Sequence, residues 1–248
     1  MTLSNVVRGK ESRPRMCTLY GTQGIGKSTF GASAPGSIFL PTEDGLADID
    51  CARFPLLRSV PEVLDAISSL YTEDHEFRSV VVDSLDWLEP LIWQHVVETH
   101  GAARGCKSIE DFGYGKGYLL ATDTWRQIIE GLAALRRDRK MHIILLAHAM
   151  IQRFEDPTTA SYDRYMPRLH KGAAALVQEA CDEVLFARYR VYVREEAKGF
   201  GGKAAKGAGH GERIVCTEER PSHAAKNRLS LPYEMPLSWA SYAEHFNK

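Results

Sequence analysis

A glycine-rich segment near the start of the chain has the residue types and spacing that bind phosphate groups. It reads Gly-Thr-Gln-Gly-Ile-Gly-Lys-Ser, a full match to the pattern G-x-x-x-x-G-K-[ST]. Glycines let such a loop curl until several backbone N–H groups point at one anion, and the lysine adds a positive charge. We therefore expect a loop that holds ATP, made of Gly21, Thr22, Gln23, Gly24, Ile25, Gly26, Lys27, Ser28 and Thr29.

A hydroxyl and a carboxylate are the predicted ligands of a magnesium ion beside that loop. Ser28 is the hydroxyl, and Asp83 follows the β-branched run 80–82. That run is typical of a buried parallel strand, so Asp83 would stand at the carboxyl edge of the sheet, where ligands bind. The alternative for Asp83 is a cap of the helix that follows. Asp86 is expected in the first turn of that helix.

Two further polar residues follow predicted strands and are candidates for catalysis together with Lys27. Glu43 comes shortly after the strand 37–40 and could polarise a water molecule aimed at the terminal phosphate, with Asp44 as its competitor. His148 follows the apolar run 143–147 and could hydrogen-bond the same phosphate. The alternatives are a solvated acid for Glu43 and a histidine satisfied by local backbone for His148.

Strands that alternate with helices must position these residues. We expect strands over 16–20, 37–40, 79–83, 143–147, 183–195 and 213–217, and helices over 27–34, 61–71, 85–99, 118–136 and 172–179. The pattern predicts an α/β fold with a mostly parallel central sheet, flanking helices and a C-terminal antiparallel hairpin. Residues 1–15 are expected to be a flexible basic arm and residues 16–248 the core. The polar stretch 150–171 is too long for an ordinary connector.

Composition restricts the class of protein. The 248 residues suit one domain, and 31 Lys and Arg against 32 Asp and Glu give a net charge of −1, which argues against a wholly basic nucleic-acid coat. No apolar run approaches the roughly 20 residues that span a bilayer. The five cysteines are odd in number, without a C-x-x-C pair, so we expect reduced thiols in a cytoplasmic protein, with neither disulfide nor zinc site.

The order of these parts resembles the RecA recombinase ATPase core over roughly residues 16–240. In that family the catalytic glutamate follows the strand after the phosphate loop, as Glu43 does, and Val81-Val82-Asp83-Ser84 reads like its Walker B segment. The nearest resemblance is to small phage-encoded RecA-like proteins implicated in recombination and single-strand annealing. It implies that Lys226 and Arg228 reach into the ATP of a neighbouring subunit, in a filament or ring of identical copies.

The resemblance also implies single-stranded DNA as a partner, and a single-strand DNA-binding protein as a further one. Two loops would face the strand, 101–116 and 150–171, through cations that follow phosphates and rings that stack on bases. The candidate contacts are Lys107, Tyr114, Lys116, Arg153, Arg164, Tyr165, Arg168 and Lys171. The expected activity is a DNA-dependent ATPase with ATP and Mg²⁺ as ligands.

Two alternatives share every nucleotide-binding residue. One is a helicase or translocase motor with the same fold, which only duplex unwinding would separate from a recombinase. The other is an annealing protein that uses ATP as an assembly switch. A small-molecule kinase is disfavoured because the glycine-rich segment 198–211 carries lysines but no arginines for a lid.

Overall fold

The computed structural model describes residues 6, 8, 9, 13–198, 202–208 and 211–246. Its helices are α1 (Lys27–Ala32), α2 (Val60–Thr72), α3 (Leu85–Val96), α4 (Lys116–Asp138), α5 (Lys171–Ala180) and α6 (Trp239–Ala243). The first strands are β1 (Met16–Gly21), β2 (Ser37–Pro41), β3 (Ala52–Arg53), β4 (Ser79–Asp83), β5 (His142–Phe154) and β6 (Tyr162–Pro167). The later strands are β7 (Glu183–Tyr189), β8 (Tyr192–Lys198), β9 (Gly202–Ala208), β10 (Arg213–Cys216), β11 (Lys226–Asn227) and β12 (Glu234–Pro236).

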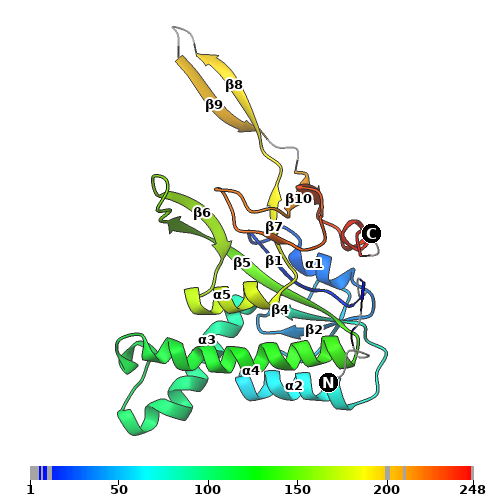
Figure 1. Ribbon diagram of the computed structural model, residues 1–248, viewed down its shortest axis with the longest axis vertical. Helices are drawn as coiled ribbons and strands as arrows, with labels where there is room; N and C mark the ends of the chain where they lie inside the picture. The colour runs from blue at the N-terminus through cyan, green and yellow to red at the C-terminus, as the bar shows by residue number, and fades with distance from the viewer. Residues whose placement is uncertain (1–5, 7, 10–12, 199–201, 209–210, 247–248) are drawn as a thin grey trace.

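A mostly parallel sheet organises the molecule, as the sequence predicts. The strand order is β12-β10-β7-β1-β5-β4-β2-β3, in which the strands from β7 to β3 run parallel and β10 and β12 are antiparallel. The ends of the parallel strands are in register, with Gly21 beside His148 and Pro41 beside Asp83. One edge of the sheet therefore collects the residues that follow β1, β2, β4 and β5 (Figure 1).

Helices cover both faces of the sheet, and the alternation of side chains along each strand builds two apolar cores. In β5, Ile143 and Leu145 pack toward α2, α3, α4 and α5, whereas Ile144 and Leu146 pack toward α1 and α6. Every one of these four side chains is fully buried. Such continuous apolar strands are what a parallel sheet with two covered faces requires, and Figure 1 shows the larger helical layer on one side.

Two segments differ from the expected element pattern. Residues 150–154 and 162–167 are not a loop: β5 continues to Phe154 and pairs antiparallel with β6. The pairing is stabilised by cross-strand contacts, since Phe154 packs on Tyr162 with ring centroids 5.4 Å apart. The expected strand over 183–195 is also divided, into β7 and β8, and β8 pairs with β9 in a separate hairpin (Figure 1).

The segment expected as a flexible arm lies partly outside the described residues. Its last three residues have partners: Arg13 pairs with Asp182 at 3.1 Å, Arg15 pairs with Glu183, and the carbonyl of Pro14 accepts a hydrogen bond from Arg136 Nε at 2.6 Å. Among the described residues no helix combines the length and apolarity needed to cross a bilayer. All five cysteines are free.

Candidate functional site

The glycine-rich loop forms a tight turn between β1 and α1. Gly24 and Gly26 have positive φ angles of 73° and 106°, a conformation that L side chains rarely adopt. Lys27 is only 6% exposed, and its ammonium group donates to the carbonyls of Gly21 at 3.3 Å and Thr22 at 3.1 Å. Burial lowers the pKa of Lys27, against the opposing effect of Asp83. The loop thus holds one desolvated cation whose hydrogen bonds, among the described residues, go to the carbonyls of the loop itself.

A cavity of about 930 Å³ opens beside this loop. Its walls come from the loop, from the ends of β2, β4 and β5, and from α3. The lining includes Gln23, Gly24, Gly26, Lys27, Ser28, Thr29, Glu43, Asp44, Asp83, Trp87, His148, Arg168 and Arg213. Of the expected loop residues, Ile25 is fully buried, and Gly21 and Thr22 face Lys27 through their carbonyls. The structure therefore brings the predicted Lys27, Ser28, Glu43, Asp83 and His148 to one cavity.

Ser28 and Asp83 meet at the base of the cavity. The Ser28 hydroxyl donates to Asp83 Oδ2 at 2.7 Å, so two oxygen ligands already converge. Burial raises the pKa of Asp83, and the hydrogen bond from Ser28 and the charge of Lys27 oppose that rise. No cluster of three or more His, Cys, Asp or Glu side chains in the described residues could hold a metal alone. The pair fits Mg²⁺, which takes few protein oxygens and completes its shell with water and phosphate.

Hydrogen bonds from Thr42 to the end of β4 hold the neighbouring Glu43 near Asp83. The Thr42 N–H donates to the Asp83 carbonyl at 2.8 Å, and the Thr42 hydroxyl donates to the Ser84 carbonyl at 2.7 Å. These bonds tie the turn after β2 to the end of β4. Burial raises the pKa of Glu43, and the negative charge of Asp83 raises it further. Asp44 also lines the cavity but is exposed, whereas Glu43 is half-buried.

Asp86 has a larger role in the site than its expected place in a helical turn indicates. Its carboxylate accepts from the His148 N–H at 2.9 Å and contacts His148 Nδ1 at 3.0 Å. Arg168 donates to the same carboxylate through Nε at 3.1 Å and through Nη2. Burial would raise the pKa of Asp86, but the bonds from His148 and Arg168 hold it well below its usual value. The signal in the sequence is the position: Asp86 lies three residues after Asp83, in the first turn of the helix that follows β4.

The side chains of His148 and Arg168 are therefore both held by Asp86 at this edge of the sheet. His148 is held by Asp86 rather than by local backbone alone, and its ring still lines the cavity. Arg168, expected to contact DNA, instead closes one side of the nucleotide-sized cavity in an ion pair with Asp86. The physical reason is the β5–β6 hairpin, which returns the chain to the sheet edge at Pro167 beside Ala149.

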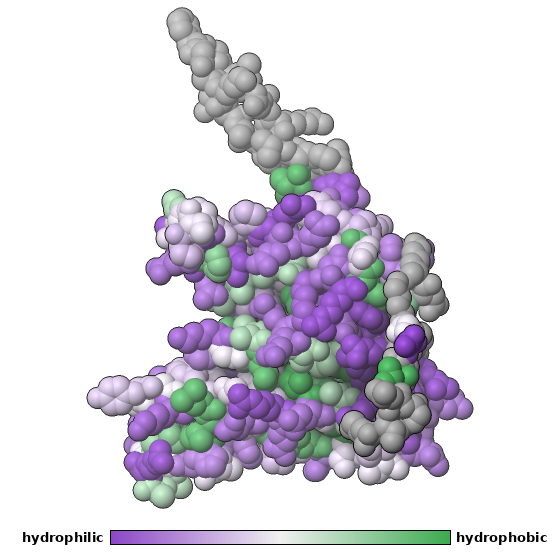
Figure 2. Space-filling model, in the orientation of Figure 1, coloured by the Kyte–Doolittle hydropathy of each residue, from purple (hydrophilic) through white to green (hydrophobic). Residues whose placement is uncertain are grey.

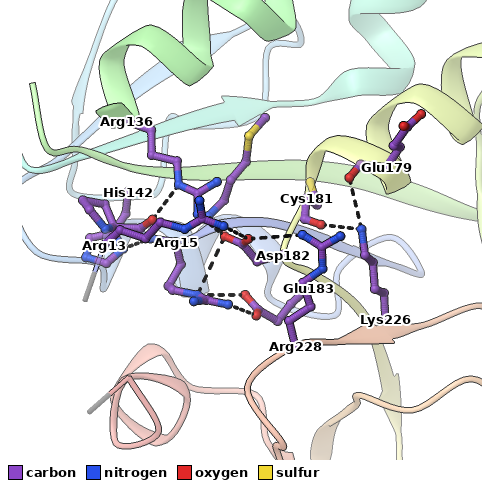
Figure 3. A network of polar contacts seen from close by, with 12 residues as sticks. Arg13, Arg15, Arg136, His142, Glu179, Cys181, Asp182, Glu183, Lys226 and Arg228 are labelled. Carbon is purple, nitrogen blue, oxygen red and sulfur yellow. Dashed lines mark hydrogen bonds and ion pairs between the residues drawn. The ribbon is translucent and has the colours of Figure 1, made fainter. Parts of the chain in front are cut away.

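Lys226 and Arg228 lie at the opposite edge of the sheet, beside the start of β7 (Figure 3). The Lys226 ammonium donates to the carbonyls of Gln178 at 2.6 Å, Glu179 at 3.1 Å and Cys181 at 2.7 Å. It thereby satisfies the last carbonyls of α5, a role that the sequence did not indicate. Arg228 is exposed, with Nη1 3.8 Å from Asp182 Oδ1. Neither side chain lines the cavity of its own chain.

The residues expected to contact DNA divide into two groups. Lys107, Tyr114, Lys116, Arg153 and Lys171 are exposed, and so is Arg168 although it pairs with Asp86. Arg164 is instead paired with Glu219 at 2.9 Å and lies over the Phe154 ring. Tyr165 stacks on Phe186 with centroids 5.0 Å apart. Arg164 and Tyr165 therefore stabilise the hairpin and its contact with the sheet, because their cation and ring are already used within the chain.

Comparison with known proteins agrees with this geometry. A search of curated proteins finds no match. A family model described as an AAA domain matches residues 13–229, which include the loop, both site carboxylates, His148 and the whole parallel sheet. The chain therefore belongs to the AAA domain family, a P-loop ATPase type of domain.

Proposed function

We propose that this protein hydrolyses ATP with the help of Mg²⁺. The observation that carries the proposal is the convergence of Lys27, the Ser28–Asp83 pair and Glu43 on one cavity. Each supplies a different requirement of phosphoryl transfer to water: a cation for the phosphates, oxygen ligands for the metal and a carboxylate for the water. The cavity of about 930 Å³ is large enough for a nucleoside triphosphate.

The side chains have distinct roles in this scheme. Lys27 exchanges its two loop carbonyls for phosphate oxygens, and its burial strengthens that attraction. Ser28 and Asp83 hold the metal, which neutralises charge on the phosphates when bound. Glu43 accepts a proton from the attacking water, and its raised pKa makes it a stronger base than an exposed carboxylate. His148, oriented by Asp86, is placed to donate a hydrogen bond to an oxygen of the terminal phosphate.

The separation of the two carboxylates supports a RecA-like arrangement within the P-loop ATPases. Asp83 ends β4 and is followed by Ser84, so the base does not come from the residue beside it. Glu43 comes from the turn after β2, the next strand of the sheet, and the Thr42 hydrogen bonds hold that turn against β4. This is the placement that the resemblance to the RecA core predicts for the water-activating glutamate.

Substitution of Glu43 tests the proposal. Glu43→Gln keeps the shape and hydrogen bonds of the side chain but cannot take a proton, so we expect ATP hydrolysis to fall by about 10²- to 10⁴-fold with ATP affinity retained. Asp44→Asn is the matched control, since Asp44 lines the same cavity but is exposed. Wild-type turnover in Glu43→Gln together with a large loss in Asp44→Asn would assign the base to Asp44.

We further propose that single-stranded DNA is the partner that this ATPase acts on. The support is the set of side chains that remain exposed: Lys107, Tyr114 and Lys116 before and at the start of α4, and Arg153 on β5. Tyr114 is fully exposed, which suits a ring that stacks on a base. The loop 101–116 and the β5–β6 hairpin project on the same side of the molecule in Figure 1, and the space-filling view in the same orientation shows them as two separate lobes (Figure 2).

The DNA proposal is tested by hydrolysis and binding in parallel. We expect single-stranded DNA to increase ATP turnover, and Tyr114→Ala to weaken its binding by about tenfold at low salt. Arg137→Ala is the control, because Arg137 is an exposed cation at the far end of α4, paired with Asp138. Slow turnover unaffected by DNA, with assembly that depends on ATP, would favour the annealing protein that uses ATP as a switch. Unwinding of duplex DNA would favour a motor.

The role of Arg228 in a neighbouring subunit is part of the same proposal. Arg228 is 55% exposed at the edge of the sheet opposite the cavity, where a second copy could receive it. If it acts between subunits, turnover per chain rises with protein concentration, and Arg228→Ala removes that rise while ATP affinity is unchanged. Turnover per chain that is independent of concentration contradicts the role.

A further inference from the structure

A small hollow adjoins the large cavity on the side of the loop away from Glu43. Its volume is about 130 Å³. One wall is the outer face of α1, with Thr29 and Ser33, and the other is the segment after β12, with Leu237 and Ser238. Gly26, Thr29 and Arg213 line both the hollow and the large cavity, so the two spaces share a boundary at the phosphate loop.

Arg213 stands at that boundary. It is the first residue of β10, where it pairs with Tyr189, and its carbonyl accepts from the Leu237 N–H at 3.2 Å. Its Nη1 lies 3.0 Å from the point where a Cβ on Gly26 would stand, and Leu237 Cδ2 lies 3.7 Å from the same point. Arg213 is exposed and forms no ion pair with any residue that the structure describes. Its guanidinium thus lies against the phosphate loop, with no carboxylate of the described residues paired to it.

The residues on the two sides of the phosphate loop indicate which way a bound triphosphate points. Glu43, Asp83 and His148 line the large cavity but not the hollow, so the terminal phosphate belongs at their end. The nucleoside must then leave the loop on the other side of Gly26, past Thr29. That path leads between Arg213 and Leu237 into the hollow.

We propose that this hollow holds the nucleoside of the bound nucleotide, and that Arg213 binds the base by stacking its planar guanidinium on the ring. The inference rests on the proposed function, since it takes the phosphate loop as the place of the triphosphate. A guanidinium suits this position because it is planar and weakly hydrated, and it stacks on aromatic faces whatever the base. Leu237 supplies an apolar contact beside the base, and the Ser238 hydroxyl a polar contact at its edge.

Calorimetric titration with two probes tests the assignment. ATP carries phosphates and nucleoside, and inorganic tripolyphosphate carries phosphates alone; both are titrated with Mg²⁺ into the wild type, Arg213→Ala and Arg213→Lys. We expect both variants to bind ATP about tenfold more weakly, with the affinity for tripolyphosphate in Arg213→Lys within about twofold of the wild type. Lysine keeps the charge but not the planar face, so it separates stacking from attraction to phosphate.

The other possible results of this titration contradict the proposal in different ways. If Arg213→Ala weakens both probes equally and Arg213→Lys restores both, Arg213 is a phosphate ligand and the proposed base contact is wrong. If neither variant changes ATP affinity, the nucleoside lies elsewhere. If the wild type binds neither probe, the phosphate-loop function itself fails, which is distinct from both cases. Arg220→Ala is the control, because Arg220 is an exposed arginine that packs on Tyr233 and lines neither space.

Discussion

The parallel sheet buries charged groups at both its amino edge and its carboxyl edge. Those at the amino edge are paired within the chain, whereas those at the carboxyl edge line a cavity. At the amino edge, Asp182 and Glu183 are 1% and 0% exposed in their side chains and are surrounded by arginines (Figure 3). Asp182 pairs with Arg13 at 3.1 Å and also with Arg136, and Glu183 pairs with Arg15 and accepts from the Tyr242 hydroxyl at 2.5 Å. At this edge the carboxylates are satisfied within the chain.

At the carboxyl edge the buried charges face open space. Lys27 donates to two loop carbonyls, Asp83 accepts from Ser28, and Glu43 lines the same cavity of about 930 Å³. Burial raises the pKa of Glu183 at one edge and of Asp83 and Glu43 at the other, so a shifted pKa alone does not identify the site. What distinguishes the carboxyl edge is that its buried charged groups line a cavity, where a bound ligand could neutralise them.

The largest expected effect comes from removing the cation of the carboxyl edge. Lys27→Ala should reduce ATP hydrolysis by about a thousandfold, because it removes the charge that faces the phosphates. Its unfolding midpoint should stay near that of the wild type, since burial lowers the pKa of Lys27 and its charged form is held at a cost. An ATP-hydrolysis assay and urea unfolding measure the two properties, and calorimetric titration checks that the variant no longer binds ATP. Retained ATP affinity would refute the site.

The amino edge should respond in the opposite way. Asp182→Ala leaves Arg13 and Arg136 without their carboxylate and the Met16 N–H without its acceptor at 3.2 Å. We expect it to lower the free energy of unfolding by about 3 kcal/mol, as the loss of one partner of a buried ion pair does. ATP affinity measured well below the unfolding transition should not change. An equal loss of ATP affinity at full folding would show that the two edges are coupled.

Much of the carboxyl edge was predictable because it depends on short-range patterns. The loop 21–28 is specified by its own residues, and the β-branched run before Asp83 indicates a buried strand that ends at the ligand-binding edge. Glu43 follows from the same argument applied to 37–40. Parallel strands end together, so the convergence of these residues needs only the fold class to be right.

The rest depended on contacts between segments far apart in the sequence. The hairpin of β5 and β6 brings Arg168 to Asp86, but residues 150–171 carry no two-residue tight-turn signal from which this hairpin could be predicted. The sequence alone therefore favours a contact of Arg168 with DNA. The three carbonyl partners of Lys226 belong to the end of α5, more than 40 residues earlier in the chain, so the sequence does not reveal them. Without these partners, the sequence leaves Lys226 available for a role between subunits. Arg213 has no sequence motif at all, and only packing against Gly26 reveals it.

Glu89 is a third kind of buried acid, a carboxyl group that pairs with no cation of the described residues. It lies on α3 one turn beyond Asp86, is 5% exposed, and accepts from the His170 N–H at 3.0 and 3.1 Å. Burial, together with the negative charge of Asp86, raises the pKa of Glu89 to about 7. The folded protein therefore holds a proton that the unfolded chain releases above its usual pKa near 4.5, so stability should fall as the pH rises from about 4.5 to 7.

Glu89→Gln should remove this pH dependence, because glutamine keeps the acceptor for His170 and never ionises. We expect the variant to match the wild type at pH 4.5 and to exceed its free energy of unfolding by about 2 kcal/mol at pH 8, measured by urea unfolding. Glu130→Gln, an exposed residue of α4, is the control and should follow the wild type at both values. A Glu89→Gln difference that is the same at pH 4.5 and pH 8 would mean that the carboxylate is ionised throughout, and that its pKa is not raised by burial.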